Sequence, residues 1–159
     1  MTSHEVIKNK LESLRRCLTR IEEHQPTTVQ ALRKNLDSQD VIMLNIERAV
    51  QMCVDIAAHI LSENESRPPA TYAESFHALR DAKVISANAA HCMFQAVGFR
   101  NIAVHEYTEI NWKIVFNIVV HNLKDFKLFA SEIMTWLARL EKKKRKKRVR
   151  KTKKSPKLS

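Results

Sequence analysis

Apolar residues recur at steps of three and four along most of the chain, which is the spacing of one face of an α-helix. In residues 5–24 this face consists of Ile7, Leu11, Leu14, Leu18 and Ile21. Ser3 is the expected N-cap of this helix, and Pro26 ends the pattern. Residues 38–63 carry a wider apolar stripe, so we expect a central helix that contacts several neighbours.

The second half of the chain predicts three further helices. Residues 73–81 fit a short helix, a second begins at Ser86, and a long one begins at about Asn111. Polar loops are expected between them and from Pro26 to about Asp37. One glycine and four prolines in 159 residues leave few turns, and no alternating strand pattern competes. The predicted fold is therefore all-α, an antiparallel bundle of four main helices plus one short helix in residues 1–141.

Charge separates the end of the chain from the rest. The 28 basic residues include twelve after Glu141, which leaves 16 against 17 acidic residues, or about −1, in residues 1–141. The basic segment includes Lys142, Lys143, Lys144, Arg145, Lys146, Lys147, Arg148 and Arg150. A segment with so little apolar surface is expected to be disordered over residues 142–159 and to bind RNA through its phosphates.

Several classes of protein are disfavoured by what the sequence lacks. No apolar run approaches the roughly 18 residues that span a bilayer, and the first residues show no secretion signal. Cys17, Cys53 and Cys92 are scattered and odd in number, which favours reduced thiols in a cytoplasmic protein. No His, Asp and Glu set has ligand spacing, so neither a metal nor a cofactor is expected.

Candidate chemistry is concentrated in residues 98–110, GFRNIAVHEYTEI, which contain the only glycine, Gly98. Arg100 offers a planar set of donors that fits a phosphate, and His105 can take or give a proton near neutral pH. Together they could cleave RNA without a metal, with His105 acting at the ribose 2′-hydroxyl or the leaving oxygen and Arg100 stabilising charge at phosphorus. The spacing alone also fits ordinary polar surface residues at a helix end.

The geometry of this cluster depends on the helix through Gly98. In a continuous helix Arg100 and His105 lie about 140° apart, whereas glycine weakens the helix and makes a bend expected. Two copies of the chain meeting in a dimer could bring two histidines to one phosphate. Asp55 and His59, four residues apart, are a second possible base pair, although a helix-face hydrogen bond is the better interpretation.

The segment GFRNIAVHEYTEIN resembles the R-x4-6-H-x-Y motif of HepT toxins, which are HEPN-type ribonucleases. LESLRRCLTRI, LDSQDVIMLNIERAVQMCVDIAAHIL and IVFNIVVHNLKDF resemble other helices of that family, so the resemblance spans roughly residues 4–137. It implies a homodimeric, metal-independent endoribonuclease that acts on tRNA or mRNA. Arg100 and His105 are then catalytic, and Asn101 helps to position the phosphate or the histidine.

The resemblance also implies a partner. HepT toxins are paired with MntA, a nucleotidyltransferase antitoxin that uses ATP to attach AMP to the motif tyrosine, which here is Tyr107. AMP groups beside Arg100 and His105 would exclude RNA. No ATP would be used by this chain itself. The basic segment departs from the family pattern.

Two other functions remain open on the sequence. The chain could be a non-catalytic subunit that binds a nucleotide or another substrate for a nucleotidyltransferase, with Arg100 holding a phosphate. It could also be a simple RNA-binding protein that acts through the basic segment alone.

Overall fold

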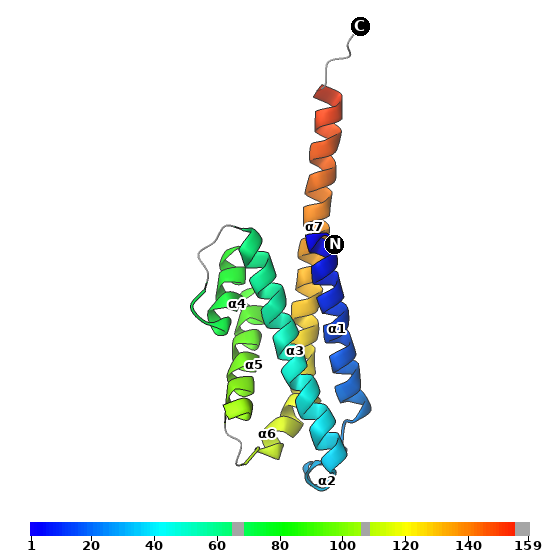
Figure 1. The fold of residues 1–159 in the computed structure, drawn as a ribbon, viewed down its shortest axis with the longest axis vertical. Helices are drawn as coiled ribbons and strands as arrows, with labels where there is room; N and C mark the ends of the chain where they lie inside the picture. Colours follow the sequence, from blue (N-terminus) through cyan, green and yellow to red (C-terminus); the bar gives the residue numbers. More distant parts are fainter. Residues whose placement is uncertain (65–68, 106–108, 155–159) are drawn as a thin grey trace.

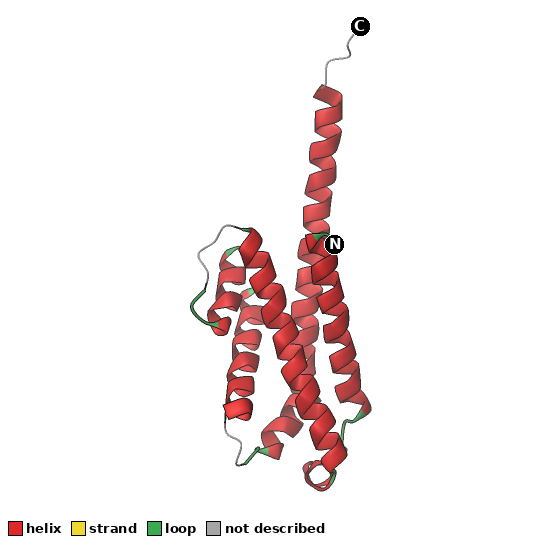
Figure 2. Ribbon diagram, in the orientation of Figure 1, coloured by secondary structure: helices red, strands yellow, loops and turns green. Residues whose placement is uncertain are grey.

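The described part of the chain is entirely helical (Figures 1 and 2). A computed structural model describes residues 1–64, 69–105 and 109–154, with residues 104 and 105 described by backbone only. The elements in chain order are α1 (Ser3–Glu23), α2 (Val29–Lys34), α3 (Leu36–Glu63), α4 (Tyr72–Asp81), α5 (Ala87–His105), α6 (Trp112–Asn117), the π-helical turn η1 (Ile118–Asn122) and α7 (Leu123–Lys154). The all-α bundle expected from the sequence is confirmed.

The long helices pack side by side (Figure 1): α3 runs antiparallel to α1 and α5, and α7 runs antiparallel to the same two helices. α3 contacts α1, α4, α5 and α7, as its wide apolar stripe predicts. The predicted face of α1 is buried against it, from Ile7 to Ile21. Phe76 of α4 and Phe129 of α7 meet edge to face, with ring centroids 5.7 Å apart. Burial of such side chains is the main source of stability, at roughly 1.5–3 kcal/mol for each large one.

Side-chain caps fix several helix starts. Thr2, not the expected Ser3, is the N-cap of α1, and with Glu5 it forms a reciprocal capping box. Thr71 caps α4, and Asn111 caps α6 by accepting from two backbone N–H groups. The threonine precedes the serine by one residue, and both are good caps, so sequence alone could not choose between them.

Two segments differ from the sequence expectation. The stretch expected to be a loop up to Asp37 contains the short helix α2, which is capped by Thr28 and buries Leu32. The last helix is interrupted by the π-helical turn η1, which separates α6 from α7. Such turns hold one extra residue per turn and often occur at functional sites.

The expectation of a disordered basic segment is wrong for residues 142–154, because α7 continues as a helix to Lys154. In Figure 1 this continuation, Lys142–Lys154, extends past the N-terminus of α1; we call it the basic arm. Two causes explain it. Lysine and arginine are good helix formers, and α7 contains no glycine or proline. The packed part of α7 also supplies the nucleus that an isolated segment would lack.

An ion-pair cluster holds α7 where it leaves the bundle. Glu141 lies 3.4 Å from Lys8 Nζ and 3.5 Å from His4 Nδ1, both on α1. The hydrogen bond from Lys8, with a smaller contribution from His4, lowers the pKa of the Glu141 carboxyl. The basic arm therefore starts from a fixed point on α1.

Candidate active site

α5 carries the candidate residues, and α7 fixes its first turn. The backbone N–H of Ser86 donates to Glu132 Oε1 at 2.5 Å, and the Ser86 hydroxyl donates to Oε2 at 2.9 Å. The same hydroxyl accepts from the backbone N–H of Ala89 at 3.1 Å, as an N-cap does. A carboxylate on α7 thus sets where α5 begins. This role of Glu132 could not be predicted from the sequence, because Glu132 lies 46 positions after Ser86 and no pattern of residues connects them.

The core contacts of α5 end shortly before the motif. Ala89, Ala90, Met93 and Val97 are buried against the bundle, and Val97 is the last buried residue among the described side chains of α5. The small alanines allow α5 to approach its neighbours closely. Arg100 and Asn101 follow the last buried residue, although the partly buried Phe99 still packs against the core.

α5 continues through Gly98 without interruption. The glycine is not in the left-handed region, and a Cβ added to it would meet no atom within 4 Å. Nothing in the described part of the chain requires a glycine here. The helical register therefore holds from Ser86 to the end of α5 and fixes how the motif residues are spaced.

That register places three motif positions around one side of the helix. At about 100° per residue, Asn101 lies about 40° from Val97 on one side and Arg100 about 60° on the other. His105 is a further 40° beyond Asn101, so Asn101 lies between the two candidate catalytic positions. The backbone thus brings Arg100, Asn101 and His105 to one end of α5, on one side of it.

Arg100 and Asn101 are the motif side chains that the structure describes in the last turns of α5. Arg100 is partly buried and Asn101 is exposed. Within the described ranges neither side chain makes a hydrogen bond or ion pair. A guanidinium without an acidic partner is suited to an anion from outside the chain, because it must otherwise be satisfied by water. The side chain of His105 and all of Tyr107 lie outside the described residues.

Other candidate chemistries find no support among the described residues. These contain no group of three His, Cys, Asp or Glu side chains that could hold a metal. Burial raises the pKa of the Cys17 and Cys53 thiols, and burial together with Asp125 raises that of Cys92. The thiols therefore stay protonated and are poor nucleophiles.

The Asp55–His59 pair considered from the sequence does not form. His59 Nε2 lies 2.8 Å from the Ser3 hydroxyl, while Asp55 accepts from Gln51 and Lys10. Both residues therefore contact α1, His59 through Ser3 and Asp55 through Lys10, and Asp55 also accepts a hydrogen bond from Gln51 within α3.

The basic arm is a separate cationic surface. All of its side chains are exposed. Lys144, Arg145 and Arg148 line a groove with Lys8 and Glu141 at the start of α1. None of the arm residues lies near α5 in Figure 1, so the arm and the motif occupy different parts of the molecule. No helix in the described part of the chain is long and apolar enough to cross a membrane.

Comparison with known proteins identifies related chains. The model of the family described as "Ribonuclease HepT-like" matches residues 14–133. An "mRNA nuclease HepT" of Shewanella oneidensis is 34% identical over 130 residues, which are 82% of this chain and 97% of the relative. A "tRNA nuclease HepT" of Aphanizomenon flos-aquae is 26% identical over 136 residues, covering 86% and 92% of the two chains.

A solved structure has the same fold. It is described as the tri-AMPylated Shewanella oneidensis HEPN toxin in complex with the MNT antitoxin. The TM-score is 0.77 at 33% identity, and the match covers 85% of this chain and 99% of that one. The basic arm lies beyond the matched family model, which ends at residue 133.

Proposed function

The chain belongs to the HepT-like ribonuclease family, and from that premise we propose that it is the toxin of a toxin–antitoxin pair that cleaves cellular RNA without a metal ion. The observation that carries the proposal is Arg100, a partly buried guanidinium with no acidic partner in the described part of the chain. It lies on the same end of α5 as the position of His105. Since the two named relatives are an mRNA and a tRNA nuclease, these are the RNA classes we propose as substrates.

The proposed reaction is a phosphoryl transfer within the RNA. His105 accepts the proton of a ribose 2′-hydroxyl, the 2′-oxygen attacks the adjacent phosphorus, and the bond to the 5′-oxygen breaks. The products are a 2′,3′-cyclic phosphate and a 5′-hydroxyl, whose oxygen takes a proton from a second acid. Arg100 stabilises the negative charge that develops on the phosphate oxygens, and Asn101 helps to position the phosphate or the histidine.

A homodimer would supply the second acid. Phe94, Gly98 and Ile102 form one stripe on α5, and the side chains of Phe94 and Ile102 are 45% and 60% exposed. Glycine in a helix costs about 1 kcal/mol relative to alanine, yet nothing inside the chain needs it at position 98. A second helix packed against the stripe would need that space. The position of His105 lies about 20° from that of Gly98, so both histidines would face a shared cleft.

Tyr107 is the proposed site of control. It stands two residues after His105, in the H-x-Y part of the motif. Covalent AMP there would bring phosphates within reach of Arg100 and block RNA. The AMPylated Shewanella oneidensis toxin bound to its MNT antitoxin supports a nucleotidyltransferase as the partner that attaches AMP with ATP.

The basic arm is proposed to hold RNA by its phosphates. The twelve cations of residues 142–159 meet no acidic residue in that range, and the rest of the chain is near neutral. Each neutralised phosphate releases counterions, so the affinity should depend steeply on salt.

The deciding experiment is RNA cleavage by purified chain in excess EDTA, beside His105→Ala, with the intact mass recorded on the same samples. We expect the wild type to cleave, His105→Ala to lose at least 100-fold in rate, and the products to carry cyclic phosphate ends. Arg100→Lys tests whether the planar set of donors on the guanidinium is needed, because lysine keeps the positive charge but lacks that planar arrangement.

Each contrary outcome refutes a different part of the proposal. Loss of cleavage in EDTA, restored by a divalent ion, would contradict the metal-free reaction. Absence of cleavage by a chain whose mass shows a bare Tyr107 would favour the non-catalytic nucleotide-binding subunit. Cleavage by the His105→Ala variant at the wild-type rate would remove the motif from the mechanism.

A further inference from the structure

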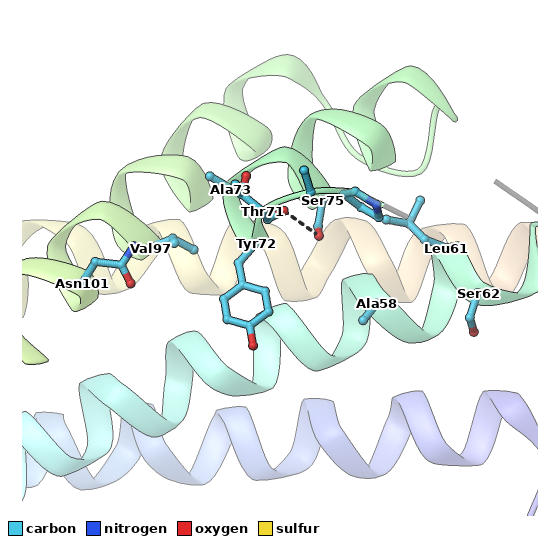
Figure 3. A pocket seen from close by; sticks show the side chains of 11 residues that line it. Ala58, Leu61, Ser62, Thr71, Tyr72, Ala73, Ser75, Val97 and Asn101 are labelled. Carbon is cyan, nitrogen blue, oxygen red and sulfur yellow. Dashed lines mark hydrogen bonds between the residues drawn. The ribbon is translucent and has the colours of Figure 1, made fainter. Parts of the chain in front are cut away.

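A pocket of about 670 Å³ opens beside the motif, between the end of α3, the start of α4 and the last turns of α5 (Figure 3). Its wall is built from Ala58, Leu61, Ser62, Pro69, Ala70, Thr71, Tyr72, Ala73, Ser75, Val97 and Asn101. The volume is within the range of small-molecule sites, which are mostly apolar with a few placed polar groups. The pocket therefore has the size and the lining of a ligand site.

The pocket lies between the two candidate catalytic positions. Val97 and Asn101 of α5 form one of its sides, as Figure 3 shows. On the helix Arg100 lies about 60° to one side of Val97, and His105 lies about 80° to the other. A group in this pocket would therefore be next to a phosphate held by Arg100.

None of the described residues that line the pocket carries a charge. A phosphate placed against these residues would lose hydration without gaining a cation from them, which is unfavourable. A neutral and partly apolar ligand fits the lining better. Arg100 and the basic arm are the proposed sites for phosphates, and this pocket would bind a different, neutral part of the same ligand.

Two side chains in the wall suit a flat ring with polar edges. Tyr72 is 56% exposed, and in Figure 3 its ring projects across the groove between α4 and α3. Asn101 carries an amide that can donate and accept. Neither the Tyr72 hydroxyl nor the Asn101 amide has a hydrogen-bond partner among the described residues. The hydroxyls of Ser62 and Ser75 donate to backbone carbonyls of their own helix turns and keep a free lone pair.

We propose that this pocket binds one unpaired nucleobase of the RNA, stacked on Tyr72 with its edge on Asn101, next to the phosphate that is cleaved. The inference rests on the proposed ribonuclease function. Unpaired bases are recognised by stacking on aromatic rings and by hydrogen bonds to their edges. The enzyme then has a specificity site at Tyr72 that adjoins the reacting groups and shares Asn101 with them.

Binding of a fluorescent base tests this without cleavage. The probe is a short single-stranded RNA with every 2′-hydroxyl methylated and 2-aminopurine at one position, which is shifted along the strand in a series. It is titrated into the full-length chain, after mass measurement has shown that Tyr107 carries no AMP. Stacking on Tyr72 is expected to quench the fluorescence at one position of the series.

Variants locate the effect. Tyr72→Ala should weaken binding roughly 5- to 150-fold and abolish the quenching, because it removes one base–aromatic stack. Tyr72→Phe keeps the ring and should retain both. Met134→Ala is the matched control, because Met134 is 46% exposed on α7 and does not line the pocket.

The outcomes for the pocket and for the ribonuclease proposal are distinguishable. Binding and quenching that are unchanged in Tyr72→Ala would overturn the pocket inference, even if unmethylated RNA is cleaved through His105. Quenching that depends on Tyr72, in a chain that cleaves no RNA, would support the pocket and overturn the ribonuclease proposal. Under both proposals, Tyr72→Ala should shift the preferred cleavage positions without abolishing cleavage.

Discussion

The substitution Gly98→Ala should change the stability of the isolated subunit and the affinity of the dimer in opposite directions. The substitution adds a methyl group where nothing lies within 4 Å, in a helix whose glycine has no positive φ. Alanine has the higher helix propensity by about 1 kcal/mol, so the isolated subunit should gain stability. For a chain of 159 residues this corresponds to a melting temperature about 2–4 °C higher.

The dimer should respond in the opposite direction. If a partner helix packs on the stripe of Phe94, Gly98 and Ile102, the added methyl group must push it away. Overpacking of this kind costs about 1–3 kcal/mol, which would raise the dissociation constant roughly 5- to 150-fold. RNA cleavage should then fall at low protein concentration and recover at high concentration.

The assay combines unfolding with sedimentation. Thermal unfolding below the dissociation constant reports on the subunit, and analytical ultracentrifugation over a concentration series reports on the dimer. Asn88→Ala is the matched control, because it raises helix propensity at an exposed position about 15 Å from Gly98, toward the start of α5. A Gly98→Ala chain that dimerises as tightly as the wild type would refute the packing of a partner on this stripe.

Three further predictions concern α7. Deleting residues 142–159 should leave the bundle folded and reduce the slope of log affinity for single-stranded RNA against log salt by about 0.7 for each lost phosphate contact, measured by fluorescence anisotropy. Ser86→Ala, which removes the cap and its bond to Glu132, should lower the free energy of unfolding by about 0.5–2 kcal/mol in urea titrations. Because the folded-state pKa of Glu141 is lowered, its contribution to stability is present above the unfolded-state pKa and is lost as the pH falls through the folded-state pKa. Glu141→Gln should therefore flatten the acid side of the stability profile, and an unchanged profile would contradict the pairing with Lys8.

The fold was predictable where one apolar face is buried against a neighbour. α1 and α3 follow their periodic stripes from end to end, since burial imposes the helical period on the sequence. α2 was not predicted, because a helix of six residues with one buried leucine leaves almost no periodic signal. The π-helical turn inside the last helix was missed as well, since Val115, Val119 and Leu123 recur at steps of four, which also fits an α-helical face.

The site was predictable only in its chemistry. Arg100 and His105 could be chosen because their residue types and spacing match a phosphate-cleaving pair and a known family motif. The hydrogen bonds of Ser86 to Glu132 and the position of Tyr72 at the pocket could not be predicted from the sequence. Both features depend on contacts between helices that are far apart in the sequence. No local pattern of residues shows which exposed tyrosine lies beside a pocket.

The helical state of the basic arm changes what the arm can do for an RNA substrate. A disordered tail raises the local concentration of RNA but leaves its direction free. α7 is one helix from Leu123 to Lys154, and its Glu132 also holds the first turn of α5. Lys154 lies 22 residues after Glu132, which corresponds to about 33 Å along the helix at 1.5 Å per residue. RNA phosphates bound by the arm would therefore lie in a fixed direction from the motif, so the arm can orient a structured RNA as well as retain it. The matched family model ends before the arm begins, so this orientation would distinguish the chain from relatives that share only the bundle.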